Sequence, residues 1–386
     1  MVLKTIGEIL ELQRGYDLPV DEMAGGSIPV VGSNGIVGYH DTKKSISPTI
    51  TVGRSGSIGK VHYYDGETWV HNTALYVSNF KGNNPLYLYY LLKNLDFENL
   101  KSSSVVPSLN RNYVYPMKIP FVSDIKEQER IAYVLNLIDK KISLNTRMNA
   151  ELEAMAKQLY DYWFVQFDFP DENGKPYKSS GGKMVYNSTL KREIPEGWEI
   201  RTLDDLTSTP KESINPFDEP NKEFRHYSIP AYDACGSYII EKGHSIQSNK
   251  FLVRNGQILA PKLNPWYNRI IMVNNDTDGI CSTEYVILEA NEDFLKGFIF
   301  YVVKTESFIS YCTKGSTGTS HSQRRVPPEI LKNYTIPYNR NIVSKYSECV
   351  MSLINCLNSN LEQTRQLSNL RDSLLPMLMN GQVTVK

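Results

Sequence analysis

Apolar residues recur at alternating steps of four and three in two stretches of the chain, residues 131–163 and 346–378. This is the period of a heptad seam, in which one apolar stripe of a long helix faces a partner helix. The first series is Ile131, Leu135, Ile138, Ile142, Asn145, Asn149, Leu152, Ala156, Leu159 and Trp163. The second is Tyr346, Val350, Leu353, Leu357, Asn360, Thr364, Leu367, Arg371, Leu374 and Leu378. Each stretch predicts a long helix that needs a partner, and an antiparallel pair provides one for both.

Both series become polar at their fifth and sixth positions, which are Asn145 and Asn149 in the first and Asn360 and Thr364 in the second. In an antiparallel pair the fifth position of one helix lies opposite the sixth of the other. We therefore expect Asn145 to face Thr364 and Asn149 to face Asn360. A buried polar layer lowers stability but fixes register and orientation. The alternative is that these positions are solvated gaps in an imperfect amphipathic helix.

The remaining sequence contains an internal repeat. Five pairs of similar segments follow one another in the same order: residues 3–6 with 200–203, 73–77 with 283–286, 86–93 with 298–304, 101–104 with 314–317, and 118–120 with 335–337. Most lie among β-branched and aromatic residues or in short apolar runs, which are typical of strands and buried helices. The repeat predicts two diverged copies of one mixed α/β unit.

The order of these parts predicts an α+β protein. We expect two mixed α/β domains at opposite ends of an antiparallel two-helix coiled coil, related by a pseudo-two-fold internal repeat. The expected parts are a first domain at 1–122, a first spacer helix at 123–167, a connector at 168–194, a second domain at 195–340 and a second spacer helix at 341–386. The connector is rich in Pro, Gly, Ser and Lys, so it is predicted to be solvated.

Composition limits the function classes. Lys and Arg number 42, and Asp and Glu also number 42, so the net charge is zero and any charge-driven binding must be local. No apolar run approaches the roughly 18 residues of a membrane span, and the N-terminus does not resemble a secretory signal. A cytoplasmic protein without a membrane partner is expected. The five cysteines include no C-x-x-C pair, which predicts neither a disulfide framework nor a zinc site.

Local charge is concentrated in two stretches that contain no Asp or Glu, residues 42–64 and 242–273. Their candidate DNA-binding residues are Lys43, Lys44, Arg54, Ser55, Lys60, Lys250, Arg254, Lys262, Asn264, Tyr267 and Arg269. Acid-free basic segments at similar places in the two copies predict phosphate binding. The glycines at 53–60 do not form a P-loop, because Arg54 stands where its first glycine belongs and Val61 follows the lysine. A flexible phosphate-approaching loop is favoured over an ordinary glycine turn.

A second pair of loops precedes each Ile-Pro, at 101–111 and 314–325. Their candidate base-reading residues are Asn110, Arg111, Thr317, His321, Gln323, Arg324 and Arg325. Arg pairs with guanine and Asn or Gln with adenine in the major groove. The residues differ between the copies, which predicts two different half-sites. For residues 262–269 the alternative is a half-buried hairpin with Trp266 in the core.

Motifs for chemistry are missing from the sequence. The single Pro-Pro, at 327–328, lacks the flanking residues of an amino-methyltransferase tetrad, and the single Pro-Asp is not followed by the acid and lysine of a nuclease motif. There is no Walker A, H-E-x-x-H or G-x-S-x-G motif. We therefore expect no catalytic residues and no metal site on this chain.

Several combined motifs resemble the specificity (S) subunit of type I restriction-modification enzymes. They are the segment 127–132 after the first Ile-Pro, Trp163-Phe164, the Pro-Glu-Gly-Trp at 195–198, and the leucine-rich segment 370–381. Together with two globules that alternate with two helices, they extend the resemblance over the whole chain. Residues 342–348 depart from the pattern, because they lack the Glu-Gln-Glu-Arg that begins the first helix.

The resemblance implies a non-catalytic DNA-recognition subunit. Each domain would read one half of a split site in double-stranded DNA, and the helices would set the gap between the halves. The helices would also bind two methyltransferase (M) subunits, and that complex would bind two restriction (R) subunits. S-adenosylmethionine, ATP and Mg²⁺ would belong to those partners, with no cofactor on this chain. A stand-alone bipartite DNA-binding protein without catalytic partners, and a scaffold that binds no nucleic acid, are the alternatives.

Overall fold

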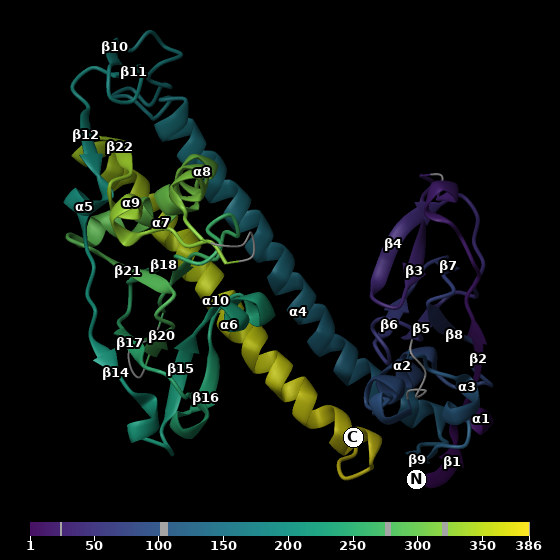
Figure 1. The fold of residues 1–386 in the computed structure, drawn as a ribbon. Coiled ribbons are helices and arrows are strands. Elements are labelled where there is room, and N and C mark those ends of the chain that lie inside the picture. The colour runs from purple at the N-terminus through teal and green to yellow at the C-terminus, as the bar shows by residue number, and fades with distance from the viewer. Residues whose placement is uncertain (24, 101–106, 275–278, 319–322, 386) are drawn as a thin grey trace. The chain divides into compact units, whose positions relative to one another are not determined.

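The computed structural model describes residues 1–23, 25–100, 107–274, 279–318 and 323–385. The chain folds into two compact units (Figure 1). The first comprises Met1–Ser143 and Gln366–Lys386, and the second comprises Leu144–Arg365. Two long helices, α4 (Ile125–Tyr160) and α10 (Arg340–Met379), contribute to both units. Each unit also holds one domain of mixed strands and helices, so the predicted α+β class is confirmed.

The domain of the first unit contains three sheets. Its strands are β1 (Val2–Thr5), β2 (Glu11–Arg14), β3 (Ile28–Gly32), β4 (Gly35–His40), β5 (Thr49–Gly53), β6 (Val61–Tyr64), β7 (Trp69–Val70), β8 (Ala74–Asn79) and β9 (Lys118–Phe121). Its short helices are α1 (Ile6–Ile9), α2 (Pro85–Lys93) and α3 (Arg111–Val114). β1 pairs antiparallel with β9, the second sheet has the order β2-β8-β5-β6, and the third has the order β4-β3-β7.

The domain of the second unit repeats this plan with additions. Its strands are β12 (Glu199–Thr202), β13 (Thr207–Ser208), β14 (Ser213–Ile214), β15 (Glu223–Tyr227), β16 (Ile239–Lys242), β17 (Lys250–Val253), β18 (Ile258–Pro261), β19 (Ile271–Met272), β20 (Gly279–Cys281), β21 (Tyr285–Ala290) and β22 (Thr335–Tyr338). Its helices are α5 (Leu203–Leu206), α6 (Ile229–Cys235), α7 (Lys296–Lys304), α8 (Glu306–Gly315) and α9 (Pro328–Lys332).

The two domains match sheet by sheet. β12 pairs antiparallel with β22 as β1 does with β9, and the order β13-β21-β18-β19 corresponds to β2-β8-β5-β6. Each domain has one parallel pair, β3 with β7 and β15 with β20. The second domain adds α6, β14 and β17. The predicted repeat is therefore confirmed for four of its segment pairs, while residues 101–104 of the fifth lie outside the described residues.

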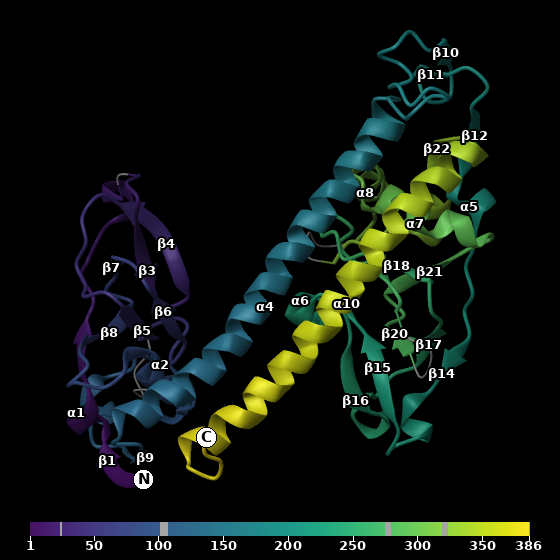
Figure 2. The same ribbon diagram turned by 180° about the vertical axis from the view of Figure 1, so that it is seen from behind.

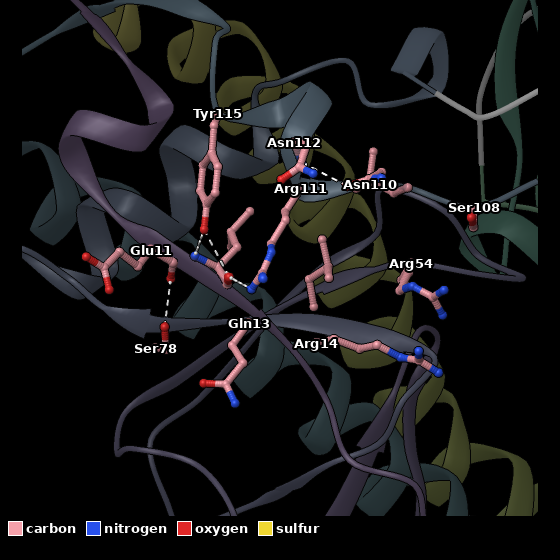
Figure 3. A pocket seen from close by; sticks show the side chains of 13 residues that line it. Glu11, Gln13, Arg14, Arg54, Ser78, Ser108, Asn110, Arg111, Asn112 and Tyr115 are labelled. Carbon is pink, nitrogen blue, oxygen red and sulfur yellow. Dashed lines mark hydrogen bonds between the residues drawn. The ribbon is translucent and has the colours of Figure 1, made fainter.

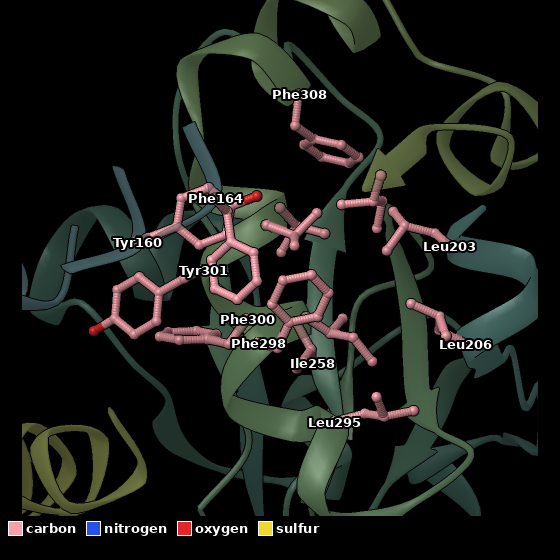
Figure 4. Packing of buried hydrophobic residues seen from close by; sticks show 14 of the residues in the cluster. Tyr160, Phe164, Leu203, Leu206, Ile258, Leu295, Phe298, Phe300, Tyr301 and Phe308 are labelled. Atoms are coloured by element: carbon pink, nitrogen blue, oxygen red, sulfur yellow. The ribbon is translucent and has the colours of Figure 1, made fainter. Parts of the chain in front are cut away.

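Each unit has its own apolar core, and the long helices contribute to both. In the first unit α2 packs beside β5 and β8, with Ile131 and Leu135 of α4 and Leu375 and Leu378 of α10 in the same cluster. In the second unit the core gathers around α7, where Phe298, Phe300 and Tyr301 pack with Tyr160, Phe164 and Tyr346 (Figure 4). Phe298 and Tyr346 are fully buried. The helices are thus integral to the domains.

Within each unit, α4 and α10 run antiparallel (Figure 2). In the second unit the Tyr346 hydroxyl donates to the carbonyl oxygen of Ala156 at 3.3 Å. In the first unit Arg371 donates to Asp139 at 2.9 Å. No member of the two predicted apolar series is exposed, as expected for a seam between paired helices.

The segment predicted to be a solvated connector, residues 168–194, is mostly exposed and leads into a small folded hairpin. α4 continues into a π-helical turn, Asp161–Val165, and β10 (Met184–Asn187) pairs with β11 (Arg192–Pro195). The Phe169 ring stacks on Tyr177 at 4.7 Å and on Trp198 at 5.2 Å. The Asp168 carboxylate accepts from the amide and hydroxyl of Ser179, and these bonds lower the pKa of Asp168. Aromatic residues scattered among Gly and Ser supply the core of this hairpin.

Candidate nucleic-acid interface

The two acid-free stretches form matching parts of the two domains. Residues 42–64 supply β5 and β6, and residues 242–273 supply β17, β18 and β19. One loop joins β5 to β6 and another joins β18 to β19. Gly53 at the end of β5 lies opposite Ala74, and Pro261 at the end of β18 lies opposite Tyr285. The next residues, Arg54 and Lys262, therefore have the same position in the two domains.

The first loop is a tight turn that depends on glycine. A Cβ atom on Gly53 would lie 1.9 Å from the carbonyl oxygen of Ser57, so a side chain cannot be accommodated there. Gly59 has a φ of 77° and leaves no room for a Cβ against Phe97. Its amide donates to the Gly53 carbonyl oxygen at 2.9 Å. The five residues between Gly53 and Gly59 are thus held in one compact turn.

Two backbone hydrogen bonds clamp Arg54 at the start of this turn. The Arg54 amide donates to the Thr73 carbonyl oxygen at 2.8 Å, and the Leu109 amide donates to the Arg54 carbonyl oxygen at 2.8 Å. Leu109 belongs to the second predicted loop. The clamp therefore brings two loops together that the sequence could only predict separately.

Beside the clamp is an open pocket of about 880 Å³ (Figure 3). Its polar lining is Glu11, Gln13, Arg14, Arg54, Ser78, Ser108, Asn110, Arg111, Asn112 and Tyr115. Figure 3 shows the Arg14 and Arg54 guanidinium groups reaching to the same side. Arg111 donates to the Leu12 carbonyl oxygen at 2.9 Å, and Arg54 to the Asn72 carbonyl oxygen at 3.3 Å.

The pocket carries uncompensated positive charge. Among the described residues, Arg14, Arg54 and Arg111 form no ion pair, whereas Glu11, the acid of the lining, pairs with Lys81 at 3.6 Å. Burial and then the charge of Arg14 lower the pKa of Arg54. Arginine still remains protonated, so an anion placed between the two guanidinium groups would be stabilised. Together with the amide side chains, the pocket suits a phosphate and base edges.

The other candidates of the first unit have partners within the protein. Lys43 pairs with Glu67, and Lys44 lies over the rings of Tyr16 and Trp69 at 5.0 and 4.9 Å. Lys60 donates to Asn34 at 2.8 Å, and the Ser55 amide donates to Thr73 at 3.1 Å. Asn110 caps α3 by accepting from the Asn112 amide at 3.0 Å. Of the predicted cations of the first unit, Arg54 and Arg111 are the ones that line the pocket.

The second unit clamps Lys262 in the same way. The Lys262 amide donates to the Glu284 carbonyl oxygen at 2.8 Å, and the Val326 amide donates to the Lys262 carbonyl oxygen at 3.0 Å. Asn264, Arg324, Thr317 and Arg325 extend this junction through backbone hydrogen bonds of 2.7 to 2.9 Å. The predicted loops are again brought together, here with Lys262 at the centre.

Four of the six predicted cations of the second unit have partners within the protein, and their role in DNA binding stays a prediction. Lys250 is 7% exposed and donates to Ser248 at 3.0 and 2.5 Å. Arg254 pairs with Glu212 at 2.7 Å, Arg269 with Asp233 at 2.7 Å through two hydrogen bonds, and Arg325 with Glu284 at 3.0 Å. The partner carboxylates lie outside the acid-free stretch in sequence but reach it in space.

The remaining candidates have mixed surroundings. Arg324 donates to the Ser316 carbonyl oxygen at 2.5 Å, Gln323 is exposed, and His321 lies outside the described residues. Tyr267 is exposed, with the Arg269 guanidinium 4.4 Å from its ring centre. Trp266 is half-buried in the connection between the antiparallel strands β18 and β19, so the segment is a hairpin as in the alternative, but Trp266 is not part of an apolar core cluster of the described residues.

The four polar seam residues are in contact within the second unit. Asn360 donates to the side-chain oxygen of Asn149 at 2.9 Å, and Asn145 donates to Thr364 at 3.4 Å and to Gln363 at 2.8 Å. Asn145 is fully buried. These contacts contradict the alternative of solvated gaps.

Sequence reasoning missed several residues of the pocket. Arg14 and Gln13 belong to β2, which lies far from the acid-free stretch in sequence but forms part of the sheet that contains β5. Asn34, in the turn between β3 and β4, was also missed; it does not line the pocket but accepts from Lys60 and from Ser57. No local sequence signal indicates these residues, because strand pairing places them.

Comparison with known proteins identifies the family. Residues 1–154 match the family described as "Type I restriction modification DNA specificity domain". The chain is 25% identical to the type I restriction enzyme MjaIX specificity subunit of Methanocaldococcus jannaschii over 328 residues, covering 78% of this chain and 69% of that protein. Residues 1–154 therefore contain a type I DNA specificity domain, and the similarity of the chain to curated specificity subunits supports its interpretation as such a subunit.

A second relative and a solved structure agree with this assignment. The HindI specificity subunit of Haemophilus influenzae is 22% identical over 328 residues, covering 68% of each protein. The crystal structure of a type I restriction-modification S subunit from M. genitalium has the same fold, with a TM-score of 0.66 and 17% identity over 98% of this chain and 96% of that one. Within the described part of this specificity subunit, no helix is long and apolar enough to cross a membrane, and no three His, Cys, Asp or Glu side chains are grouped to hold a metal ion.

Proposed function

We propose that this specificity subunit binds double-stranded DNA with both domains and reads one half of a bipartite site with each. The observation that carries the proposal is the pocket of the first unit, where Arg14, Arg54 and Arg111 have no ionic partner among the described residues. Gln13 and Asn112 line the same pocket. Cations of this kind hold phosphates, and neighbouring amides and guanidinium groups discriminate bases.

Two different half-sites follow from the differences around the shared clamp. Arg54 has arginines and amides around it, whereas Lys262 has Asn264 and an Arg325 that is bound to Glu284. Residues that differ at matching positions present different donors and acceptors to a DNA groove. The two domains are therefore expected to prefer different bases.

The helices are proposed to bind partner subunits as well as each other. α4 carries exposed apolar side chains at Tyr133, Leu137, Leu144, Met148 and Met155. At 100° per residue they fall within about 60° of one another, on a face of α4 that is turned about 110° from the centre of the seam. A second apolar stripe of this kind suits a partner helix. We propose that it contributes to binding two M subunits, and that the assembly binds two R subunits.

Catalysis is proposed to belong to those partners. S-adenosylmethionine would be bound by the M subunits, which methylate adenine in each half-site, and ATP and Mg²⁺ by the complex that contains the R subunits. This chain would position the DNA so that the partner can extrude the target base.

The polar layer is proposed to fix the register of the helix pair and with it the spacing of the half-sites. Inserting seven residues into α4 after Leu144 keeps the heptad pattern but shifts Asn149 away from Asn360. A complex that still assembles should methylate a site with a changed gap. A well-folded insertion variant that methylates the original site would contradict the spacing role.

The function as a whole is tested by sequencing the methylated bases of the source cell with the gene intact and deleted. We expect one split adenine-methylation motif to disappear on deletion and to return with the gene. An unchanged methylome would contradict the proposal. The alternative of a stand-alone DNA-binding protein predicts that the tagged chain retains no methyltransferase from its own host on purification.

A further inference from the structure

The positions of Arg54 and Lys262 carry a finer assignment that rests on the proposed function. We infer that these two side chains are equivalent phosphate anchors, each of which positions its domain on DNA without reading a base. The inference starts from the clamp that the two cations share. The amide of each cation donates to the carbonyl oxygen of the residue before β8 or β21. Its own carbonyl oxygen accepts a hydrogen bond from a backbone amide of the second loop. These two hydrogen bonds measure 2.8 and 2.8 Å at Arg54, and 2.8 and 3.0 Å at Lys262. The backbone of the two cations is thus fixed in the same way although the loops differ in sequence.

The side chains at this position share charge but not shape. Arginine offers a planar fork that matches guanine with two hydrogen bonds, whereas lysine is a point charge on a flexible stem. A position that accepts either requires positive charge, which is what a phosphate contact needs. Among the described residues neither Arg54 nor Lys262 forms an ion pair, in contrast to Arg254, Arg269 and Arg325.

The residues next to the clamp differ in chemical character between the two domains. Arg111 is the first residue of α3, and the first residue of the corresponding helix α9 is Pro328. Ser108 precedes Leu109 where Arg325 precedes Val326. The residues that differ between the domains lie on either side of the clamp. We therefore assign base discrimination to these neighbouring residues, and positioning on the DNA to Arg54 and Lys262.

The test measures how binding of the full-length chain to a mixed-sequence DNA duplex depends on salt. Each phosphate contact contributes about 0.9 to the slope of log K against log salt concentration. We expect Arg54→Ala and Lys262→Ala each to lower the slope by about one, and the double variant by about two. Arg54→Lys and Lys262→Arg should retain the slope of the unaltered chain. Arg254→Ala, which removes an exposed arginine already paired with Glu212, is the matched control and should leave the slope unchanged.

The outcomes separate the inference from the function on which it rests. If the double variant keeps the full slope, the two residues are not phosphate anchors. If Arg54→Lys loses as much affinity as Arg54→Ala, and does so for some duplex sequences and not others, Arg54 reads a base and the inference is overturned. If the unaltered chain shows no salt-dependent binding to any duplex, the proposed DNA-binding function itself fails. Thermal unfolding of each variant shows whether it is folded.

Discussion

The two domains share their strands but hold their arginines differently. In the first unit Arg14, Arg54 and Arg111 surround a pocket and form no ion pair among the described residues. In the second unit Arg254, Arg269 and Arg325 each bind a carboxylate. Arg54, Arg254 and Arg269 were predicted from stretches without acids, Arg111 and Arg325 were predicted from the second pair of loops, and Arg14 was not predicted. The difference shows that a segment free of acids in sequence is not free of them in space.

The difference in charge between the two units is clearest at two pairs of matching positions. Thr73 and Ser108 flank the Arg54 clamp in the first unit, and Glu284 and Arg325 flank the Lys262 clamp in the second. Glu284 holds Arg325 with three hydrogen bonds of 3.0 to 3.2 Å, and these raise the pKa of Arg325. The second unit thus uses an ion pair where the first uses two small hydroxyl residues.

The largest effect is expected from giving the first unit the acid of the second. Thr73→Glu adds a carboxylate at the residue whose carbonyl oxygen binds the Arg54 amide, where it lowers the positive charge near the pocket and repels a phosphate. We expect DNA binding to weaken by about 30-fold, since like charges in contact cost several kcal/mol when desolvated and less when hydrated. Fluorescence anisotropy with a labelled duplex measures the change. Thr73→Gln is the neutral control, and equal affinities of the two variants would contradict the role of charge here.

The reverse change should release an arginine in the second unit. Glu284→Gln keeps the shape of the side chain but removes the charge that holds Arg325. We expect duplex binding to strengthen by about threefold at low salt, because an exposed cation gains access to phosphate. The gain should vanish in the Glu284→Gln, Arg325→Ala double variant. Weaker binding by a folded Glu284→Gln protein would show that the ion pair itself serves DNA binding.

The smallest effect separates stability from binding. Arg269 is bound to Asp233 through two hydrogen bonds and its side chain is 14% exposed, while Asp233 is 50% exposed. We expect Arg269→Ala to lower the free energy of unfolding by about 0.5–1 kcal/mol, because the half-exposed pair is screened by water. DNA affinity should stay the same. Urea denaturation and anisotropy on one preparation measure both, and a loss of affinity with unchanged stability would return Arg269 to the interface.

The sequence was sufficient for the architecture because that information is periodic or repeated. The heptad seams predicted both long helices, and their shared polar positions predicted which side chains would meet, from Asn149 and Asn360 to Asn145 and Thr364. The order of similar segments predicted two copies of one domain. Such features depend on local spacing, which the chain displays directly.

The site was only partly predictable because strand pairing assembles it. Arg54 and Lys262 were candidates from charge alone, but nothing near them in sequence indicates Arg14 in β2 or the clamp by Leu109. The acids Glu212, Asp233 and Glu284 were likewise not predictable, since Glu212 precedes β14, Asp233 lies in α6 and Glu284 precedes β21. The folded part of the connector was not predictable for a similar reason: Phe169, Tyr177 and Trp198 form one aromatic stack only after the chain folds.

The most direct test compares two double variants in one titration against the same duplex at the same salt concentration. Arg14→Ala with Arg54→Ala removes two unpaired cations from the first unit, and Arg254→Ala with Arg325→Ala removes two paired cations from the second. We predict that the first double variant loses at least about tenfold in affinity, because two cations that neutralise phosphate are removed, while the second changes by less than about twofold. Equal losses, or a larger loss in the second variant, would contradict the assignment of the DNA-binding surface to the unpaired arginines.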